Sequence, residues 1–284
     1  MLNQNIRNTV NKHILFIRNA GWLLSIELLA KVSRILTIVV MAIFLSPTQY
    51  GLAVLCAATH DVFRILMRSG SGSQVIQCSE KDLPAFARNA TFLQWIICGC
   101  TATAQYVAAS WLAEMYNNPE LQTLLQLMAV SYLFYPIVSV KVYLLQRANN
   151  MRYFSLCNGS CIIVENLMIA FLLWCGVSVL SIAISKIVFS CMWVALFFNV
   201  PVVKYGFAFD LAIMKRLLKT SGQLATTELA KSARLHADTF IAGKILSPET
   251  FVLYSFAKSA GICLSQSIIN AYNGALFPYL SELN

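Results

Sequence analysis

Charged side chains recur at helical spacing inside stretches of the sequence that are otherwise apolar. Glu27, Lys31 and Arg34 are separated by four and three residues, so on an α-helix they lie within about 60° of one another on one face. Asp61, Arg64 and Arg68 share a face in the same way, and so do Lys231, Arg234 and Asp238, with Glu228 about 60° further round the helix. A guanidinium group forms paired hydrogen bonds with phosphate. Helices that present such faces to one another could therefore bind an anionic ligand that carries phosphate.

Two interpretations of these charges are open. In the first, pairs such as Glu27–Lys31 and Arg234–Asp238 neutralise each other and hold helices together. In the second, the charges line a water-filled cavity that has an excess of cation. The excess follows from the residues in the apolar stretches, where basic side chains outnumber acidic ones: Lys31, Arg34, Arg64, Lys186, Lys231, Arg234 and Lys258 against Glu27, Asp61, Glu165, Glu228 and Asp238.

The sequence therefore predicts an anion site formed by Arg34, Arg64, Arg234, Lys31 and Lys231. The acidic residues expected to pair with them, or to take up a coupling proton or cation, are Glu27, Asp61, Glu228 and Asp238. Lys186 and Lys258 are expected to extend to lipid phosphates, although Lys186 could instead pair with Glu165 on a neighbouring helix. His60 and His236 could relay protons, although a lone histidine in a helix is more often a packed polar residue.

The elements that must position these residues are transmembrane helices. The chain has 284 residues, of which 58% are hydrophobic and 12% are charged, about half the charged fraction of an ordinary soluble domain. This composition excludes a soluble globular enzyme, a disordered chain and a disulfide-rich secreted module. A span needs about 20 mostly apolar residues, and stretches that fit lie at 19–45, 50–69, 90–113, 121–141, 154–175, 177–200, 221–243 and 250–275.

Basic residues in the connections indicate the orientation of the chain. Every Lys and Arg between these stretches, apart from Lys244, falls on the side that holds the N-terminus. The positive-inside rule then predicts that both termini are cytoplasmic. The same asymmetry accounts for the formal net charge of +9, so nucleic acid is not expected as a partner.

An internal repeat relates the first and seventh predicted spans at an offset of 201 residues. Residues 21–28 (GWLLSIEL) align with 222–229 (GQLATTEL), and 45–50 (LSPTQY) align with 246–251 (LSPETF), without a gap. Both copies begin on the same side of the membrane, which predicts a parallel repeat. We therefore expect an all-α polytopic membrane protein with about eight spans. Its predicted parts are an N-terminal six-helix lobe (1–200), a cytoplasmic linker (201–220) and the first two helices of an incomplete second lobe (221–284).

Motifs for covalent chemistry or metal binding are absent from the sequence. The nine cysteines form no CxxC pair and are expected to be small apolar side chains rather than disulfides or metal ligands. There is no zinc-protease motif, nucleophile elbow or phosphate-binding loop. We therefore expect a protein that is not an enzyme and that uses no cofactor and no metal.

Several short segments resemble bacterial polysaccharide repeat-unit flippases of the multidrug/oligosaccharidyl-lipid/polysaccharide exporter superfamily. They run along nearly the whole chain: residues 21–28, 45–52 (LSPTQYGL), 73–77 (SQVIQ), 144–147 (LLQR), 151–154 (MRYF), 238–243 (DTFIAG), 254–258 (YSFAK) and 277–281 (FPYLS). The resemblance rests on the order and spacing of many weak positions rather than on one sharp motif. It implies a helical membrane protein of polysaccharide biosynthesis.

The resemblance implies transport of polyprenyl-pyrophosphate-linked oligosaccharide units across the bacterial inner membrane by alternating access, for polysaccharide export. The expected partners are the lipid-linked oligosaccharide, the bilayer, and polysaccharide polymerase and assembly proteins. Full-length members have two complete lobes, so this chain is expected to hold one lobe and the opening of the second. Two alternatives are a drug or organic-cation antiporter of the same superfamily and a truncated membrane scaffold that does not transport.

Overall fold

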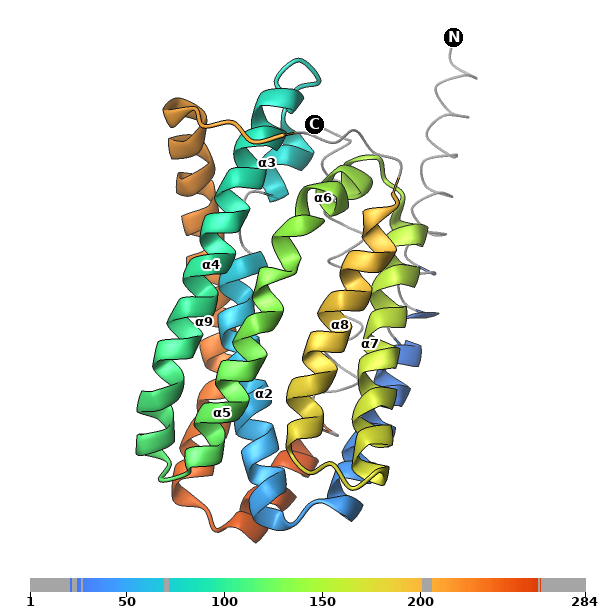
Figure 1. Ribbon diagram of the computed structural model, residues 1–284, viewed down its shortest axis with the longest axis vertical. Helices are drawn as coiled ribbons and strands as arrows, with labels where there is room; N and C mark the ends of the chain where they lie inside the picture. Colours follow the sequence, from blue (N-terminus) through green and yellow to red (C-terminus); the bar gives the residue numbers. More distant parts are fainter. Residues whose placement is uncertain are drawn as a thin grey trace.

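The computed structural model describes residues 21, 25–26, 28–68, 72–200, 206–259 and 261, and these residues form a bundle of long helices (Figure 1). A helix over 28–44 precedes α2 and another over 248–259 follows α9. The elements between them are α2 (Pro47–Arg68), α3 (Gly72–Gln77), α4 (Leu83–Met115), α5 (Pro119–Ala129), η1 (Val130–Leu133), η2 (Tyr135–Ile137), α6 (Ser139–Arg147), α7 (Met151–Trp174), α8 (Leu180–Phe198) and α9 (Leu211–Ile245). Within these ranges there is no β-strand, and the all-α prediction is confirmed.

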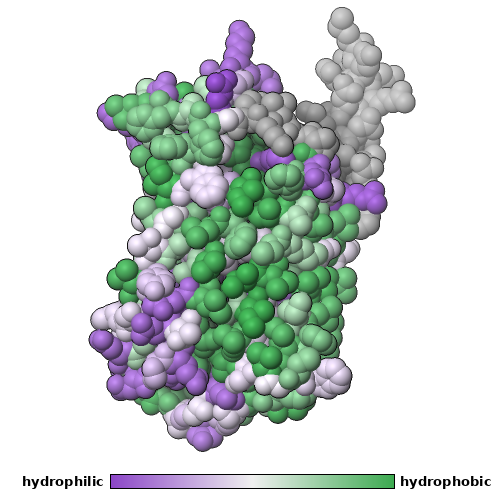
Figure 2. Space-filling model, viewed as in Figure 1, coloured by the Kyte–Doolittle hydropathy of each residue, from purple (hydrophilic) through white to green (hydrophobic). Residues whose placement is uncertain are grey.

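The apolar helices fit a chain that crosses a membrane several times. α2, α4, α7 and α8 are each long and apolar enough to span a bilayer, and they coincide with predicted spans. The α5–α6 pair adds a fifth candidate, bent by 51° at a break. Hydrophobic side chains cover most of the middle of the visible face, while hydrophilic ones gather towards its two ends (Figure 2). The helices over 28–44 and 248–259 and α9 occupy the remaining predicted positions, so the number eight stays a prediction.

The break between α5 and α6 replaces regular helix by two short 3₁₀ turns, η1 and η2. Pro136 lies in η2, where it has no backbone N–H to donate and its ring disfavours a continuing α-helix. The break falls at mid-length of the predicted span 121–141. Backbone groups freed in this way must find partners inside the protein, because lipid offers none.

The helices pack as two groups that α5 connects. α2 packs against α9, α4 and α5, whereas α7 packs against α8. α5 and the two 3₁₀ turns also contact α8, and Figure 1 shows α5 leaning between the left-hand and right-hand groups. α2 is therefore an inner helix. More than half (56%) of its apolar membrane-spanning stretch is buried inside the bundle.

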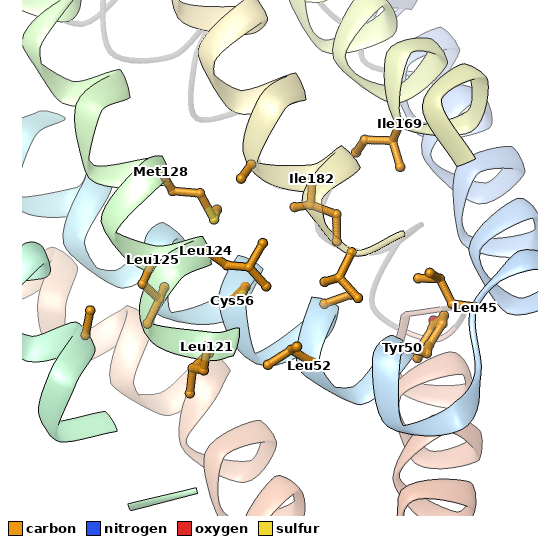
Figure 3. Close-up of a cluster of buried hydrophobic side chains, with 14 of the residues drawn as sticks. Leu45, Tyr50, Leu52, Cys56, Leu121, Leu124, Leu125, Met128, Ile169 and Ile182 are labelled. Carbon is orange, nitrogen blue, oxygen red and sulfur yellow. The ribbon is translucent and has the colours of Figure 1, made fainter. Parts of the chain in front are cut away.

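An apolar cluster joins both groups at the end of the bundle where the 45–47 turn lies. Leu52 and Cys56 of α2, Leu124 and Met128 of α5 and Ile182 of α8 pack together there (Figure 3). Further members come from α4, α7 and the residues around the turn. By the charge asymmetry of the loops this is the predicted periplasmic end, so the cluster closes that end with apolar packing.

The two copies of the predicted repeat have the same turn geometry. In each copy the Leu-Ser-Pro segment interrupts the helix for two residues, and proline is the first residue of the next helix. The serine hydroxyl accepts from the backbone N–H three residues later: Ser46 Oγ from Gln49 (3.3 Å) and Ser247 Oγ from Thr250 (3.4 Å). This is ordinary N-capping, and its recurrence at an offset of 201 residues is what a duplicated hairpin requires.

The seventh helix begins further upstream than the predicted span 221–243. Residues 211–220, assigned to the linker, form the first turns of α9 and are continuous with the seventh span. Asp210 caps this helix, because its Oδ1 accepts from the backbone N–H of Ala212 (2.8 Å) and of Ile213 (3.3 Å). Met214 and Leu217 then pack into an apolar cluster with α3, α4 and α6.

At the predicted cytoplasmic end, Arg147 fastens the short helix α3 to α6. Its Nη1 donates to the carbonyl oxygens of Val75 (3.0 Å), Ile76 (3.0 Å) and Cys78 (2.7 Å). A cation at the C-terminus of a helix satisfies free carbonyls and is favoured by the helix dipole. The contact is close, and a Cβ on Gly72 would lie 2.6 Å from the ring of Tyr143.

We predict that Gly72→Ala destabilises the protein by about 1–3 kcal/mol, because the added methyl group overpacks the α3–α6 contact. The midpoint of thermal unfolding in detergent measures this. Gly99→Ala is the matched control, since nothing lies within 4 Å of a Cβ at that position in α4. Equal midpoints for the two variants would contradict the packing described here.

Candidate substrate site

Two ionised residues of α2 lie deep inside the bundle. At 1.5 Å per residue, Asp61 and Arg64 are about 21 and 26 Å from the start of α2, a helix about 33 Å long. They therefore lie in the half of α2 that is nearer the predicted cytoplasmic end. Asp61 Oδ1 is 3.0 Å from Arg64 Nη2, and the two side chains keep 33% and 30% of their surface exposed. About a third of each side chain is exposed, so the pair is not sealed in a dry core. Because a charge in lipid is costly, we infer that the exposed surface faces the interior of the bundle.

A second ion pair reaches this position from the other helix group. Lys186 Nζ of α8 is 2.6 Å from Glu165 Oε1 of α7, and the two side chains are only 12% and 11% exposed. Lys186 acts electrostatically on Asp61, and Glu165 acts on Arg64. The predicted pairing of Lys186 with Glu165 is confirmed, and its extension to lipid phosphates is wrong, because a buried carboxylate is the closer partner. We call these four residues the central charge cluster.

A buried hydrogen-bond network supports the cluster from behind. His60, which is 2% exposed, stacks on Tyr132 of η1 with ring centroids 4.7 Å apart. The Tyr132 hydroxyl is 2.9 Å from His60 Nδ1 and 2.6 Å from Gln105 Oε1. Gln105 Nε2 in turn donates to the carbonyl oxygen of Leu125 (2.8 Å). The network joins α2, α4, α5 and the helix break.

The donors of this network assign the protonation of His60. Because Gln105 directs its N–H at a carbonyl, its Oε1 accepts from the Tyr132 hydroxyl. The Tyr132 hydroxyl also lies 2.9 Å from the carbonyl oxygen of His60. Its single hydrogen is directed at these two oxygens, neither of which can donate, so its own oxygen is left to accept from His60 Nδ1. His60 therefore has its proton on Nδ1, and Nε2 is left as the nitrogen free to bind a proton.

The helix over 28–44 places Arg34 on its inner face. The large aliphatic side chains of this helix are exposed on the opposite face: Leu28, Leu29, Val32, Ile35, Leu36, Val39 and Ile43. At about 100° per residue their mean direction is about 160° from that of Arg34. Since that aliphatic face suits lipid, the exposed Arg34 side chain lies towards the interior, and its charge acts on Asp61. Lys31 is half-buried on the same helix, and Glu27 lies outside the described residues.

The charges of α9 are arranged differently from the prediction. Asp238 accepts from Tyr254 Oη (2.5 Å), Lys258 Nζ (2.5 Å) and its neighbour's backbone N–H, that of Thr239 (2.9 Å). The interpretation of Arg234 and Asp238 as an ion pair is therefore wrong, because the Asp238 carboxylate binds Tyr254 and Lys258 of the following helix. Extension of Lys258 to lipid phosphates is wrong for the same reason.

The other charged residues of α9 remain on its exposed surface. Lys231 donates to Glu228 Oε1 (2.6 Å), and both side chains are well exposed, at 64% and 46%. Arg234 is exposed and forms no ion pair with any residue in the described ranges. His236 interacts electrostatically with both Asp61 and Arg64, so it is the residue of α9 that reaches the central charge cluster.

Of the predicted anion site, the structure thus places Arg64 against Asp61 and brings Arg34 close enough for its charge to act on the same carboxylate. It does not bring Lys231, Arg234 or Glu228 to them through any contact among the described residues. Tyr132 and Gln105 were not among the predicted site residues, and Glu165, Lys186 and His236 were predicted only in other roles. In the structure, Tyr132 and Gln105 support His60, while the other three act on the α2 pair. The available signal was the presence of polar side chains in the middle of apolar spans. No group of His, Cys, Asp or Glu in the described part of the chain is arranged to hold a metal ion.

A family model for polysaccharide biosynthesis proteins matches residues 40–284 of the sequence. The chain belongs to this family. No curated protein and no solved structure gives a significant match. Together with the apolar helices, the match makes this chain a multi-pass membrane protein of polysaccharide biosynthesis, and the resemblance stated from the sequence is confirmed.

For this family member we predict that Lys186→Met destabilises the fold by about 3–5 kcal/mol, because it leaves Glu165 buried without a partner. The double variant Lys186→Met/Glu165→Gln should recover most of this loss, since it removes both charges. Denaturant unfolding in mixed micelles measures both variants. A double variant as unstable as the single one would contradict the pairing.

We also predict that Tyr132→Phe costs about 1–3 kcal/mol, because both Gln105 Oε1 and His60 Nδ1 lose a buried partner. Tyr106→Phe is the matched control, since Tyr106 is 54% exposed on α4. Nitrogen-15 chemical shifts of labelled histidine should show the proton of His60 on Nδ1 in the unmodified protein. A proton on Nε2 would contradict the assignment.

Proposed function

We propose that this protein is a flippase that moves polyprenyl-pyrophosphate-linked oligosaccharide units across the bacterial inner membrane by alternating access, for polysaccharide export. The pyrophosphate binds in the interior of the bundle, and the polyprenyl tail stays in lipid. Both termini are cytoplasmic in this proposal, and no covalent step, cofactor or metal is required. Polysaccharide polymerase and assembly proteins are the expected partners on either side of the transport step.

The observation that carries the proposal is that Arg64 is paired with Asp61 inside the bundle and that the charge of Arg34 acts on the same carboxylate. Arg64 has a paired but water-accessible guanidinium group, and Arg34 is exposed on the inner face of its helix. A guanidinium group is suited to the planar, paired oxygens of a phosphate. Lys31, on the helix over 28–44, extends the same proposed site, whereas Lys231 and Arg234 stay on the exposed surface of α9 and form no described contact with it.

The acidic residues give the proposal a route for energy coupling. Asp61 and, in α9, Asp238 and Glu228 are already paired with cations. Together with Glu27, they are the groups that a proton or cation would neutralise, which would weaken these pairs and favour the other conformation of the transporter.

The anion interpretation is favoured over an antiporter for organic cations. A cation site would need an excess of acidic groups, whereas basic residues outnumber acidic ones in the predicted spans. A scaffold that does not transport would have no need for ionised groups at this depth, where each costs free energy.

Binding of polyprenyl pyrophosphate to the purified protein in nanodiscs tests the proposal. We expect Arg34→Gln and Arg64→Gln each to weaken binding by about 10- to 100-fold, the loss of one or two charge-assisted hydrogen bonds. Lys81→Gln is the matched control, because Lys81 is an exposed basic residue outside the bundle interior. The corresponding polyprenol, which lacks phosphate, should bind no better to the unmodified protein than to the variants.

Transport is measured in proteoliposomes that contain a fluorescently labelled lipid-linked oligosaccharide. A quencher added outside the vesicles reaches the label only after the protein has moved it to the outer leaflet, so quenching reports transport. Arg34→Gln should slow it without changing the midpoint of thermal unfolding, since Arg34 forms no ion pair with any described residue. The proposal fails if polyprenol and polyprenyl pyrophosphate bind equally well. It also fails if both arginine variants bind and transport as the unmodified protein does.

A further inference from the structure

The ion pairs of the described helices differ in how firmly their carboxylates are held. Asp238 accepts hydrogen bonds from three donors, and Glu165 lies 2.6 Å from Lys186 with little exposure. Asp61 Oδ1 is 3.0 Å from Arg64, but it is buried and accepts no hydrogen bond. The contact with Arg64 is thus electrostatic, without the donor geometry that makes such a pair strong.

The neighbours of Asp61 offer it alternatives to Arg64. Arg34, Lys186 and His60 all act on its charge, and Asp61 acts on His236 of α9. The backbone of Asp61 is fixed in α2, but its side chain is short and a third of its surface is exposed. The carboxylate therefore has room to change rotamer. Arg64, in contrast, is attracted by Glu165 as well as by Asp61, so a second carboxylate favours its position when Asp61 turns away.

We infer that Asp61 is an internal stand-in for the substrate's phosphate: it occupies Arg64 when the site is empty and is displaced when the pyrophosphate binds. This inference rests on the proposed function and names the residue that competes with the substrate. Displacement removes the only ion pair that α2 forms in the described structure. It also leaves the Asp61 carboxylate to interact with His236, and thus with the helix that begins the second copy of the repeat.

The competition has opposite effects on binding and on release. Affinity is reduced by the fraction of time for which Asp61 occupies Arg64, because only the unoccupied arginine can bind phosphate. The same carboxylate accelerates release, because it replaces the leaving phosphate and spares Arg64 an unpaired charge in the interior. Removing its charge should therefore tighten binding and slow turnover, which is the opposite of what loss of a binding residue does.

Asp61→Asn tests this, with polyprenyl pyrophosphate as the probe and nanodiscs as the membrane. We expect binding about 3- to 10-fold tighter than in the unmodified protein, a correspondingly slower dissociation, and slower transport in proteoliposomes. Asp61→Ser is a second variant that removes the charge with a smaller side chain, and thermal unfolding shows which of the two is folded. Glu114→Gln is the matched control, since Glu114 is an exposed acidic residue at the end of α4.

Tighter binding with slower transport in the folded Asp61 variant, and no change in Glu114→Gln, supports the inference. Unchanged or weaker binding in that variant overturns it, even where Arg64→Gln weakens binding and the proposed function stands. If the unmodified protein binds no polyprenyl pyrophosphate, the proposed function and the inference fall together.

Discussion

A charge inside the hydrocarbon layer must have a partner or water, and this constraint organises the interior of the protein. The described helices meet it in different ways. Lys258 donates hydrogen bonds to Asp238, to Thr239 and to the carbonyl oxygen of Leu235. Lys186 is buried and pairs with one carboxylate, that of Glu165. The Asp61–Arg64 pair is instead only loosely satisfied and keeps access to water. A site for an anion is expected where the requirement is met least completely, because there a ligand can improve on the protein's own pairing.

The same constraint gives several basic residues at the helix ends a second role. Lys141 donates to the carbonyl oxygen of Phe198 at the end of α8, and Lys244 donates to that of Met115 at the end of α4. Arg147 does the same for α3. The last carbonyls of a helix lack intrahelical partners, and cations near them are favoured by the helix dipole. Lys141 and Arg147 lie on the basic side that orients the chain in the membrane, and all three residues tie neighbouring helices together around the interior charges.

Hydropathy located the helices well, because the length and apolar character of a span are local properties of the sequence. Charge pairing was predicted less well, because it depends on which helices become neighbours. Arg234 and Asp238 are one turn apart, yet Asp238 pairs with Lys258, which the 246–248 turn brings alongside it. The Lys186–Glu165 pair was predictable, since a short connection makes α7 and α8 adjacent. Sequence spacing gave no sign that Tyr132 and Gln105 would reach His60, because that contact depends on the break after α5.

The two copies of the repeat contain the same hairpin, but different interactions hold each hairpin in place. The positions equivalent to Asp238, Tyr254 and Lys258 are Thr37, Ala53 and Ala57, so the first hairpin cannot form the ionic contact of the second. It is held to α7 by neutral hydrogen bonds instead, with Thr37 Oγ1 donating to the carbonyl oxygen of Asn166 (3.0 Å) and Asn166 Nδ2 donating to Ser33 Oγ (2.9 Å). Neutral bonds fix this hairpin without using its charges, which leaves Arg34 on one arm and Arg64 on the other arm for a ligand. In the second hairpin the charges maintain the structure. If the proposed function holds, this asymmetry between the copies favours the first hairpin as the one that responds to the ligand.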